Sequence, residues 1–269
     1  MQTKSNLTKA KKLYSKLWNN FHILKKELLH ASPQKIFEAS HLSEILTPKE
    51  IALMSEQSYL ASAERGEILW LAGMPADYVT LIVKGFVKLT KLSVSGQEVV
   101  VDILGPEHWV GLVTAVEGLG HPCHAVAGTR VWYLKIPTSA FMSVYTKNTK
   151  LKDSALRELG ERLRRAHEMM ARLSSGNLEE RLAATLLILS SQYGENTPKG
   201  LKLKIRLPIK DLANIAGVSY ENTEQILDIW KKRNILHIDH RNILIQNQEA
   251  LGEIVAQISI PPSTETTLQ

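Results

Sequence analysis

Side chains able to recognise nucleic-acid bases gather between residues 219 and 225. Glu221 can accept a hydrogen bond from the cytosine amino group, and Asn222 or Gln225 can pair with adenine through both a donor and an acceptor. Ser219 and Tyr220 carry hydroxyls suited to phosphate oxygens. Basic residues outside this stretch are further candidates for phosphate contacts: Lys202, Lys204, Arg206, Lys210 and Arg241. An isolated polar residue of this kind is ordinarily a solvated surface residue, so the interpretation requires one helix to present the set.

A second group combines imidazole and thiol chemistry. His121-Pro122-Cys123-His124, with His108 nearby, could ligate haem or a metal ion, or undergo thiol oxidation. The alternative is that these are ordinary loop and core residues, and the sequence leaves both open. Nowhere does the sequence show a nucleophile–base signature, a paired-carboxylate motif or a phosphate-binding glycine-rich loop. We therefore expect no catalytic residues, assign no metal site and expect no enzymatic activity.

The elements around the first group predict a winged helix-turn-helix. Leu201 to Leu207 alternates strictly, which predicts a strand with one basic face. Pro208 opens a short helix to Ile215, Ala216-Gly217-Val218 is a turn, and Ser219 caps a second helix running to about Arg233. Two alternating stretches, 235–238 and 243–245, flank a predicted hairpin turn at 239–242.

Small and apolar residues should let the two helices cross. Ala213 and Gly217 are small at the crossing, and four aliphatic residues are predicted to fill the core between the helices: Ile215, Val218, Ile226 and Ile229. In this motif the second helix presents its N-terminal turns to the major groove.

Short β-branched and aromatic stretches fill the region from about 66 to 136. Predicted strands lie at 68–70, 79–83, 86–89, 99–104 and 130–134. Glycine-containing turns separate them, and Lys84-Gly85 and Ser95-Gly96 should supply the positive φ angles of tight hairpins. Many short strands at close spacing are typical of a small barrel or roll.

Two segments show helical periodicity. Between about 148 and 173 the apolar stripe consists of Leu151, Ala155, Leu159, Leu163, His167, Met170 and Leu173. We interpret it as a coiled-coil-like dimer seam, the alternative being a helix that packs within its own chain. Residues 1–30 combine an apolar stripe with seven lysines, which fits a helix docked on the rest of the protein or one that meets a membrane surface, an acidic partner or DNA phosphates.

Composition sets limits on the class of protein. The chain has 269 residues, 44% of them hydrophobic, with no apolar run near the ~20 residues that cross a bilayer. The single cysteine, Cys123, cannot form an intramolecular disulfide, and the first residues do not resemble a secretory signal. We expect a cytoplasmic protein without a membrane partner. The net charge of +6 comes from residues 1–30, whereas residues 177–260 carry ten basic and ten acidic residues, so overall charge does not support DNA binding.

From residue 60 to about 247 the sequence resembles the cyclic-AMP receptor protein/FNR family of transcription regulators. The strongest segments are Ile68 to Gly85 (ILWLAGMPADYVTLIVKG) and Leu207 to Ile245, in the family's order and with a long helix between them. The resemblance implies an α+β fold made of a cyclic-nucleotide-binding-like β-roll, a long dimerisation helix and a C-terminal winged helix-turn-helix. It also implies a homodimer that reads a palindromic site in double-stranded DNA, with RNA polymerase as a further candidate partner.

The predicted effector pocket departs from the cyclic-AMP binders of this family. Their phosphate cassette is a Gly-Glu pair followed about ten residues later by an Arg-Ser pair. Here Gly111 keeps its place, but Leu112 stands at the Glu position, Pro122 at the Arg position and Cys123 at the Ser position, with His124 next. Burying a phosphate without a cation is unfavourable, so we expect no response to cyclic AMP. A cysteine-ligated iron–sulfur cluster is excluded because the N-terminal cysteines that some members use are missing. The cofactor stays unknown, with haem as an open candidate.

The recognition helix also departs from the family's sequence pattern. Gln225 stands at the position where the family has a guanine-reading Arg, and Glu224 would face the negatively charged DNA. We therefore predict a sequence-specific regulator with an altered operator. The alternative is a sensor or interaction protein whose winged helix does not read DNA. The predicted segments are a basic helical extension (1–40), the effector-sensing roll (41–147), the dimerisation helix (148–176), the winged helix-turn-helix (177–260) and a disordered tail (261–269).

Overall fold

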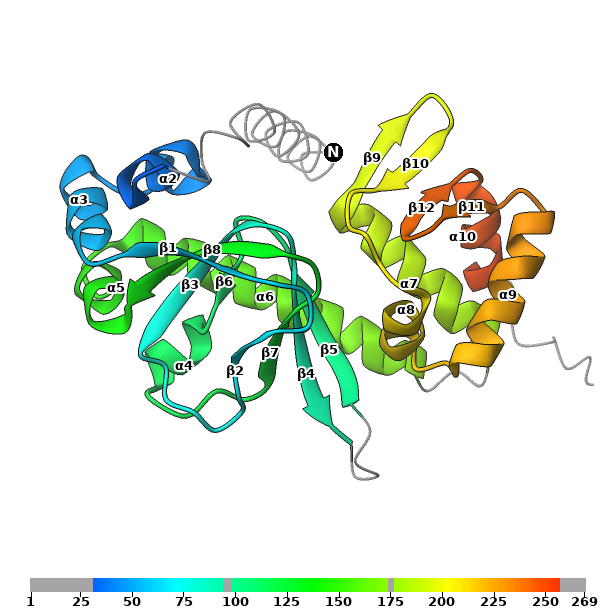
Figure 1. Cartoon of the computed structure of the whole chain (residues 1–269), viewed down its shortest axis with the longest axis horizontal. Coiled ribbons are helices and arrows are strands. Elements are labelled where there is room, and N and C mark those ends of the chain that lie inside the picture. The colour runs from blue at the N-terminus through cyan, green and yellow to red at the C-terminus, as the bar shows by residue number, and fades with distance from the viewer. Residues whose placement is uncertain (1–30, 94–97, 174–176, 257–269) are drawn as a thin grey trace, which may run out of the picture. The chain divides into compact units, whose positions relative to one another are not determined.

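A computed structural model describes residues 31–93, 98–173 and 177–256 of the chain (Figure 1). Four predicted features lie outside these residues: the helix in residues 1–30, the Ser95-Gly96 turn, the end of the dimerisation helix at 174–176 and the tail at 261–269. Contacts divide the chain into two units. Among the described residues, the first unit comprises 31–89 and 103–161, and the second comprises 90–93, 98–102, 162–173 and 177–256. The division falls inside the long helix, so the predicted domain boundaries stay predictions.

Two four-stranded sheets form the roll (Figure 1). One has the order β1-β8-β3-β6 and the other the order β2-β7-β4-β5. Their strands are β1 (Tyr59–Ala63), β2 (Ile68–Trp70), β3 (Tyr78–Lys84), β4 (Val87–Leu92), β5 (Glu98–Leu104), β6 (Trp109–Val110), β7 (His124–Ala127) and β8 (Val131–Pro137). A cluster of buried residues contributed by both sheets, including Ala63, Ile82, Leu104, Ala125 and Val131, forms one core of the roll.

Short helices pack a second core against the roll. They are α2 (Pro33–Ala39), the 3-10 helix η2 (His41–Glu44), α3 (Pro48–Glu56), α4 (Leu112–Glu117) and α5 (Thr138–Tyr145). Ile36 and Phe37 of α2 are fully buried in one cluster with Leu134 of β8 and Phe141 of α5. Before α3, Thr47 and Glu50 form a reciprocal capping box.

The predicted α+β class is confirmed, and each of the five predicted strands is present. The positive φ predicted for the Lys84-Gly85 turn is confirmed at Gly85, where φ is 84°. The prediction missed β1, β6 and β7, together with α4 and α5. These elements are short, and β1 (YLASA) and β7 (HAVA) consist largely of small residues. The β-branched signal of β1 and β7 is therefore weak, with Val126 as its one residue, and pairing with neighbouring strands decides their conformation.

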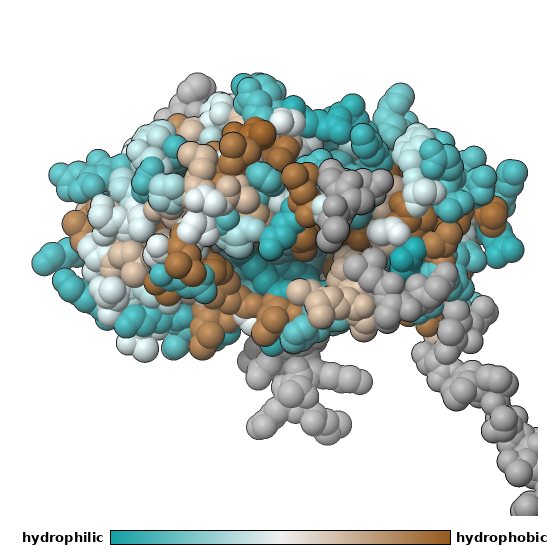
Figure 2. Space-filling model, turned by 90° about the horizontal axis from the view of Figure 1, so that it is seen from below, coloured by the Kyte–Doolittle hydropathy of each residue, from teal (hydrophilic) through white to brown (hydrophobic). Residues whose placement is uncertain are grey.

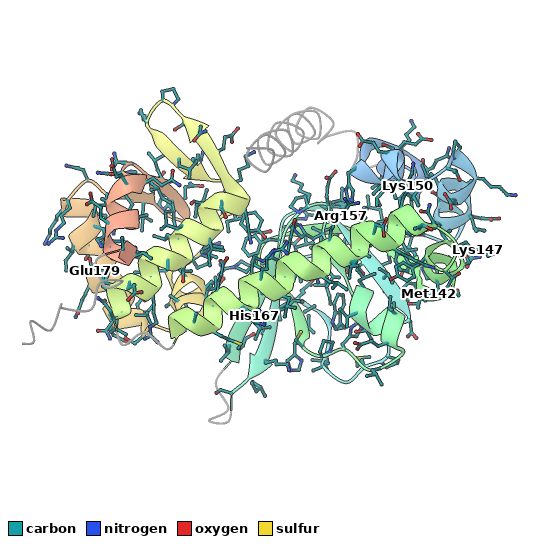
Figure 3. All side chains as sticks on the ribbon, turned by 180° about the vertical axis from the view of Figure 1, so that it is seen from behind. Met142, Lys147, Lys150, Arg157, His167 and Glu179 are labelled. Atoms are coloured by element: carbon teal, nitrogen blue, oxygen red, sulfur yellow. The ribbon has the colours of Figure 1, made fainter. Side chains whose placement is uncertain are left out.

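The long helix α6 (Thr149–Leu173) divides its predicted apolar stripe into two parts. Leu151 and Ala155 are buried in the core of the first unit, and Leu159 packs against that core. Leu163 and Met170 are 57% and 63% exposed, and His167 is also exposed (Figure 3). The prediction of one continuous dimer seam is therefore wrong for the first half of the helix. Leu156, 70% exposed, precedes Leu163 by seven residues and belongs to the exposed face instead.

The C-terminal part of the second unit combines helices with a four-stranded sheet of order β11-β12-β10-β9. Its elements are α7 (Leu178–Tyr193), β9 (Gly194–Thr197), β10 (Gly200–Leu203), α8 (Ile209–Ala216), α9 (Tyr220–Lys232), β11 (Leu236–Asp239), β12 (Asn242–Ile245) and α10 (Gln248–Ala256). The prediction of a strand as far as Leu207 is wrong, because β10 ends at Leu203. Ile205 and Leu207 remain buried, so the alternation marks the buried side of the segment that follows β10 and does not mark a longer strand.

Large hydrophobic side chains reach the surface at several places, and Figure 2 shows such brown residues on the face seen from below. The most exposed in the described residues are Leu156, Leu119, Leu92 and Met170, each above 60%. No helix within the described ranges is long and apolar enough to cross a membrane.

Candidate nucleic-acid interface

Helices α8 and α9 meet at a tight turn that the sequence specifies. Gly217 ends α8 in the left-handed region (φ 61°, ψ 33°), and its N–H donates to the carbonyl of Ala213. The Val218 N–H donates to the same carbonyl at 3.1 Å. Ser219 then caps α9, its hydroxyl oxygen accepting from the Asn222 N–H at 3.2 Å. The turn and the cap thus confirm the predicted helix-turn-helix.

The buried face of α9 fixes the orientation of this helix. Thr223, Leu227 and Trp230 are fully buried. The Trp230 indole Nε1–H donates to a carboxylate oxygen of Glu179, in the first turn of α7, at 2.8 Å (Glu179 is labelled in Figure 3). The predicted core residues Ile215 and Val218 are confirmed as buried, but the prediction for Ile229 is wrong because it is 47% exposed. The helix is rotated so that Leu227 and Trp230 take the inner positions.

The opposite face of α9 presents the predicted base-reading residues. Ser219, Tyr220, Glu221 and Gln225 are exposed, and Asn222 is half-buried. The structure therefore brings all five onto the N-terminal turns of one helix. Their contacts with DNA stay predictions.

Tyr220 makes a contact that the sequence analysis missed. Its hydroxyl donates to a carboxylate oxygen of Glu224 at 2.5 Å, one helical turn later. This hydrogen bond to a carboxylate raises the pKa of Tyr220 above its ordinary value. The spacing of four residues was the available signal, since side chains at i and i+4 are neighbours on a helix.

The candidate phosphate contacts are largely solvent-accessible. Lys202, Arg206, Lys210 and Arg241 are exposed. Lys204 is half-buried, and burial lowers the pKa of its ammonium, so it is the weakest candidate of the set. The hairpin between β11 and β12 holds Arg241, whose carbonyl accepts from the Leu207 N–H at 3.1 Å. This bond ties the hairpin to the segment that leads into α8.

The predicted effector residues lie around α4 and β7. Gly111 precedes α4 with φ at 84°, a conformation that favours glycine. Leu112 is 1% exposed and belongs to the apolar core, Cys123 is buried, and Pro122 is exposed. The His124 Nδ1 accepts from the Ala72 N–H at 3.2 Å.

His121 is a second buried polar residue of this stretch, beside Thr114. Its ring stacks on Trp70 with centroids 4.6 Å apart, and its Nδ1 lies 3.2 Å from the Thr114 hydroxyl. Burial lowers the pKa of His121, which favours the neutral imidazole. A side chain at Gly111 would approach the same ring, because a Cβ there would lie 3.4 Å from its Cε1. Among the described residues, no group of three or more His, Cys, Asp or Glu side chains could hold a metal ion.

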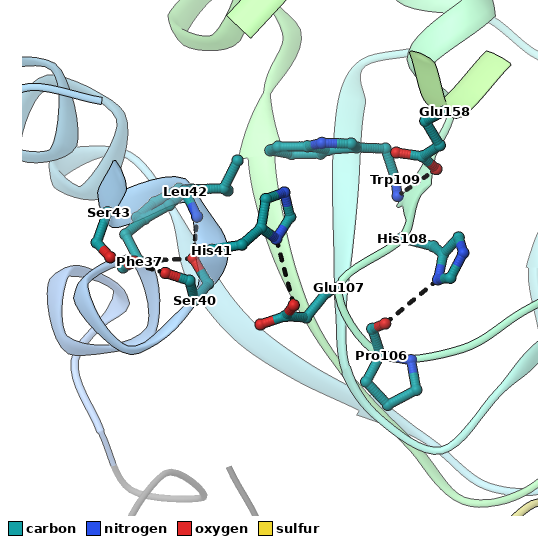
Figure 4. A network of polar contacts seen from close by, with 10 residues as sticks. All are labelled: Phe37, Ser40, His41, Leu42, Ser43, Pro106, Glu107, His108, Trp109 and Glu158. Carbon is teal, nitrogen blue, oxygen red and sulfur yellow. Dashed lines mark hydrogen bonds and ion pairs between the residues drawn. The ribbon is translucent and has the colours of Figure 1, made fainter. Parts of the chain in front are cut away.

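A polar network surrounds the loop before β6 (Figure 4). The His41 Nδ1 lies 3.3 Å from the Glu107 carboxylate, which links η2 to this loop. Two residues on, the Trp109 N–H donates to the Glu158 carboxylate of α6 at 3.1 Å. The strand that leads into Gly111 is therefore held by η2 on one side and by α6 on the other.

Residues 60–148 match the family of cyclic nucleotide-binding domains, and residues 180–254 match the Crp-like helix-turn-helix domain. The chain belongs to the CRP/FNR family of transcription regulators. It is 27% identical to the global nitrogen regulator of Synechococcus elongatus over 71% of this chain and 86% of that protein. It is 25% identical to the CRP-like cAMP-activated global transcriptional regulator of Mycobacterium tuberculosis, over 76% and 92% of the two chains.

The fold agrees with solved structures of this family. FixK2 from Bradyrhizobium japonicum superposes with a TM-score of 0.65 at 20% identity, over 73% of this chain and 96% of that one. A cyclic nucleotide is the ligand that a domain of this family implies. The residues present do not fit a cyclic phosphate, because Leu112 is buried in an apolar core and the stretch from Trp109 to Ala127 contains no lysine or arginine.

Proposed function

We propose that this CRP/FNR-family protein is a sequence-specific DNA-binding transcription regulator without enzymatic activity. The observation that carries the proposal is the division of α9 into two faces. Thr223, Leu227 and Trp230 anchor the helix, while Ser219, Tyr220, Glu221 and Gln225 face solvent on its first two turns. A rigidly held helix with a polar, exposed N-terminus is what major-groove reading requires. We place its action in the cytoplasm, at a palindromic operator, with RNA polymerase as a candidate partner.

The proposal includes a homodimer formed through α6. Leu156, Leu163 and Met170 repeat every seven residues on an exposed face, with His167 between the last two. These residues lie two helical turns apart and occupy one of the two apolar positions of the heptad that forms a two-stranded seam. Two copies related by a two-fold axis would present two α9 helices to two half-sites.

The regulator's effector is proposed to be something other than cyclic AMP. The support is the lack of a carboxylate at residue 112 and of a cation around Cys123. We expect millimolar cyclic AMP to leave the thermal unfolding temperature unchanged, since a ligand that does not bind the native state cannot stabilise it. The absorbance spectrum of the purified protein distinguishes a haem-bound form, for which His121 and His124 are the candidate ligands.

Selection from random duplexes tests DNA recognition. We expect the full chain to enrich one inverted repeat and to bind it with an affinity that falls steeply as salt increases. Gln225→Ala should broaden the enriched motif at one position of each half-site, whereas Glu249→Gln, on the exposed start of α10, should leave it unchanged. If the wild-type chain enriches no motif even at low salt, the winged helix does not read DNA. The formally neutral C-terminal segment would then belong to a sensor or interaction protein.

A further inference from the structure

The first two turns of α9 carry an unusual charge for a helix that approaches DNA. Residues 219–225 contain two carboxylates, Glu221 and Glu224, and no lysine or arginine. Both carboxylates are exposed on the side of α9 that carries Tyr220 and Gln225. Near phosphates such charges are unfavourable, so their presence calls for a compensating contact within the groove.

The hydrogen-bonding groups on the base edges limit which bases can contact these carboxylates. An ionised carboxylate is only an acceptor, and it needs a donor opposite it. In the major groove the donors are the amino groups of cytosine and adenine, whereas guanine and thymine offer acceptors at the corresponding edges. Carboxylate side chains pair with the cytosine amino group, so a fixed carboxylate favours cytosine and repels guanine and thymine.

Glu224 is fixed in this way by Tyr220. The phenol donates to one carboxylate oxygen at 2.5 Å, which leaves the other oxygen available for a base. Both residues belong to α9 and stand one turn apart, and Tyr220 remains 43% exposed. A glutamate without this partner would have free rotamers, and ordering them on binding would weaken its contribution.

We propose that Tyr220 positions the Glu224 carboxylate so that Glu224 reads a cytosine amino group at one base pair of each half-site. This inference rests on the proposed DNA-binding function. Tyr220 is a positioning residue here and not primarily a phosphate contact, and Glu224 is a specificity-determining residue in addition to Glu221.

The test compares base preferences of the full-length protein and its variants by selection from random duplexes, followed by affinity measurements on the selected site and its single-base changes. The variants are Glu224→Gln, Tyr220→Phe and the double variant. The matched control is Asp228→Asn, which removes an exposed carboxylate one turn further along α9 that is already paired with Lys231 at 3.0 Å.

We expect the wild type to prefer cytosine at one position of each half-site by about tenfold. Glu224→Gln should remove this preference, and Tyr220→Phe should reduce it severalfold while the affinity for sites changed at that position stays within about twofold. The double variant should match Glu224→Gln, because Tyr220 acts through Glu224. The control should retain the wild-type preference.

Two results would overturn the inference while leaving the proposed function intact. One is an unchanged motif in Glu224→Gln, and the other is a cytosine preference that survives intact in Tyr220→Phe. A wild-type chain that enriches no motif would overturn the proposed function, and this inference with it.

Discussion

Removing the Glu179 carboxylate should loosen the recognition helix. Trp230 is fully buried, and its indole N–H has the Glu179 carboxylate as partner at 2.8 Å. Glu179→Ala leaves that N–H buried and unsatisfied, at ~1–3 kcal/mol. It also removes a negative charge from the first turn of α7, which adds ~0.3–1 kcal/mol. The expected destabilisation of the C-terminal part is therefore ~1.5–4 kcal/mol.

Glu179→Gln separates the two contributions. The amide oxygen can still accept from the indole, so only the charge is lost and the destabilisation should be ~0.3–1 kcal/mol. Since 1.36 kcal/mol corresponds to a factor of ten, Glu179→Ala should accelerate amide exchange in α9 by roughly tenfold to several hundredfold, and Glu179→Gln by about twofold to fivefold. Hydrogen exchange measured by mass spectrometry on peptides from 220–232 reports this directly.

Glu179→Ala should weaken operator binding more than Glu179→Gln, because ordering a loosened α9 on binding costs free energy. Equal exchange rates in Glu179→Ala and Glu179→Gln would contradict the reasoning, since the buried hydrogen bond would then contribute nothing. Exchange that accelerates equally in the first unit would also contradict it, because the contact lies entirely within the second.

Three further predictions concern assembly, pH and backbone strain. The double variant Leu163→Glu/Met170→Glu should be monomeric in light scattering, because each chain loses the burial of two apolar side chains at ~1.5–3 kcal/mol each. The control variant Glu161→Lys changes an exposed residue on another side of α6 and should remain dimeric. Burial lowers the pKa of His121, so below its ordinary value near 6.5 the unfolded chain takes up a proton that the folded chain resists. Stability should fall as the pH drops from about 6.5 toward the lowered value, and urea unfolding of His121→Gln should show a flatter pH dependence. Gly85→Ala should lower the unfolding temperature more than Gly66→Ala. Both glycines have positive φ, but a Cβ at Gly85 would lie 2.4 Å from the Arg130 carbonyl oxygen, whereas a Cβ at Gly66 would meet no atom within 4 Å. Equal shifts of the unfolding temperature in the two variants would refute the prediction.

The sequence predicted those elements whose local signals agree with their tertiary environment. The α8–turn–α9 unit carries a glycine, a capping serine and a helical period, and it forms as expected. The end of the strand at Leu203 was not predicted, because residues 204–207 alternate like a strand, with Ile205 and Leu207 buried, although β10 itself stops at Leu203. Periodicity reports which side is buried and does not report hydrogen bonding between strands.

In the candidate site, too, local sequence signals predicted some features, whereas others depend on residues distant in the chain. The exposed residues of α9 followed from helical geometry, but its rotation did not, and Trp230 rather than Ile229 occupies the core. That choice depends on Glu179, 51 residues away along the chain, which offers the indole a partner. The Tyr220–Glu224 bond was readable in principle from spacing alone. The stacking of His121 on Trp70 joins the loop before β7 to β2 and had no local signal.

The division of α6 has a consequence for how the protein behaves when dilute. Its first half is tied into a folded core through Leu151 and Ala155, whereas Leu163 and Met170 are exposed within the described part of the chain and would gain apolar cover from a second copy. Isolated helical turns are marginal in water. The C-terminal turns of α6 should therefore fray in a solitary chain and become ordered on association, so that helix completion and dimer formation are one event. A cell would then set the fraction of completed helices through the abundance of the regulator itself.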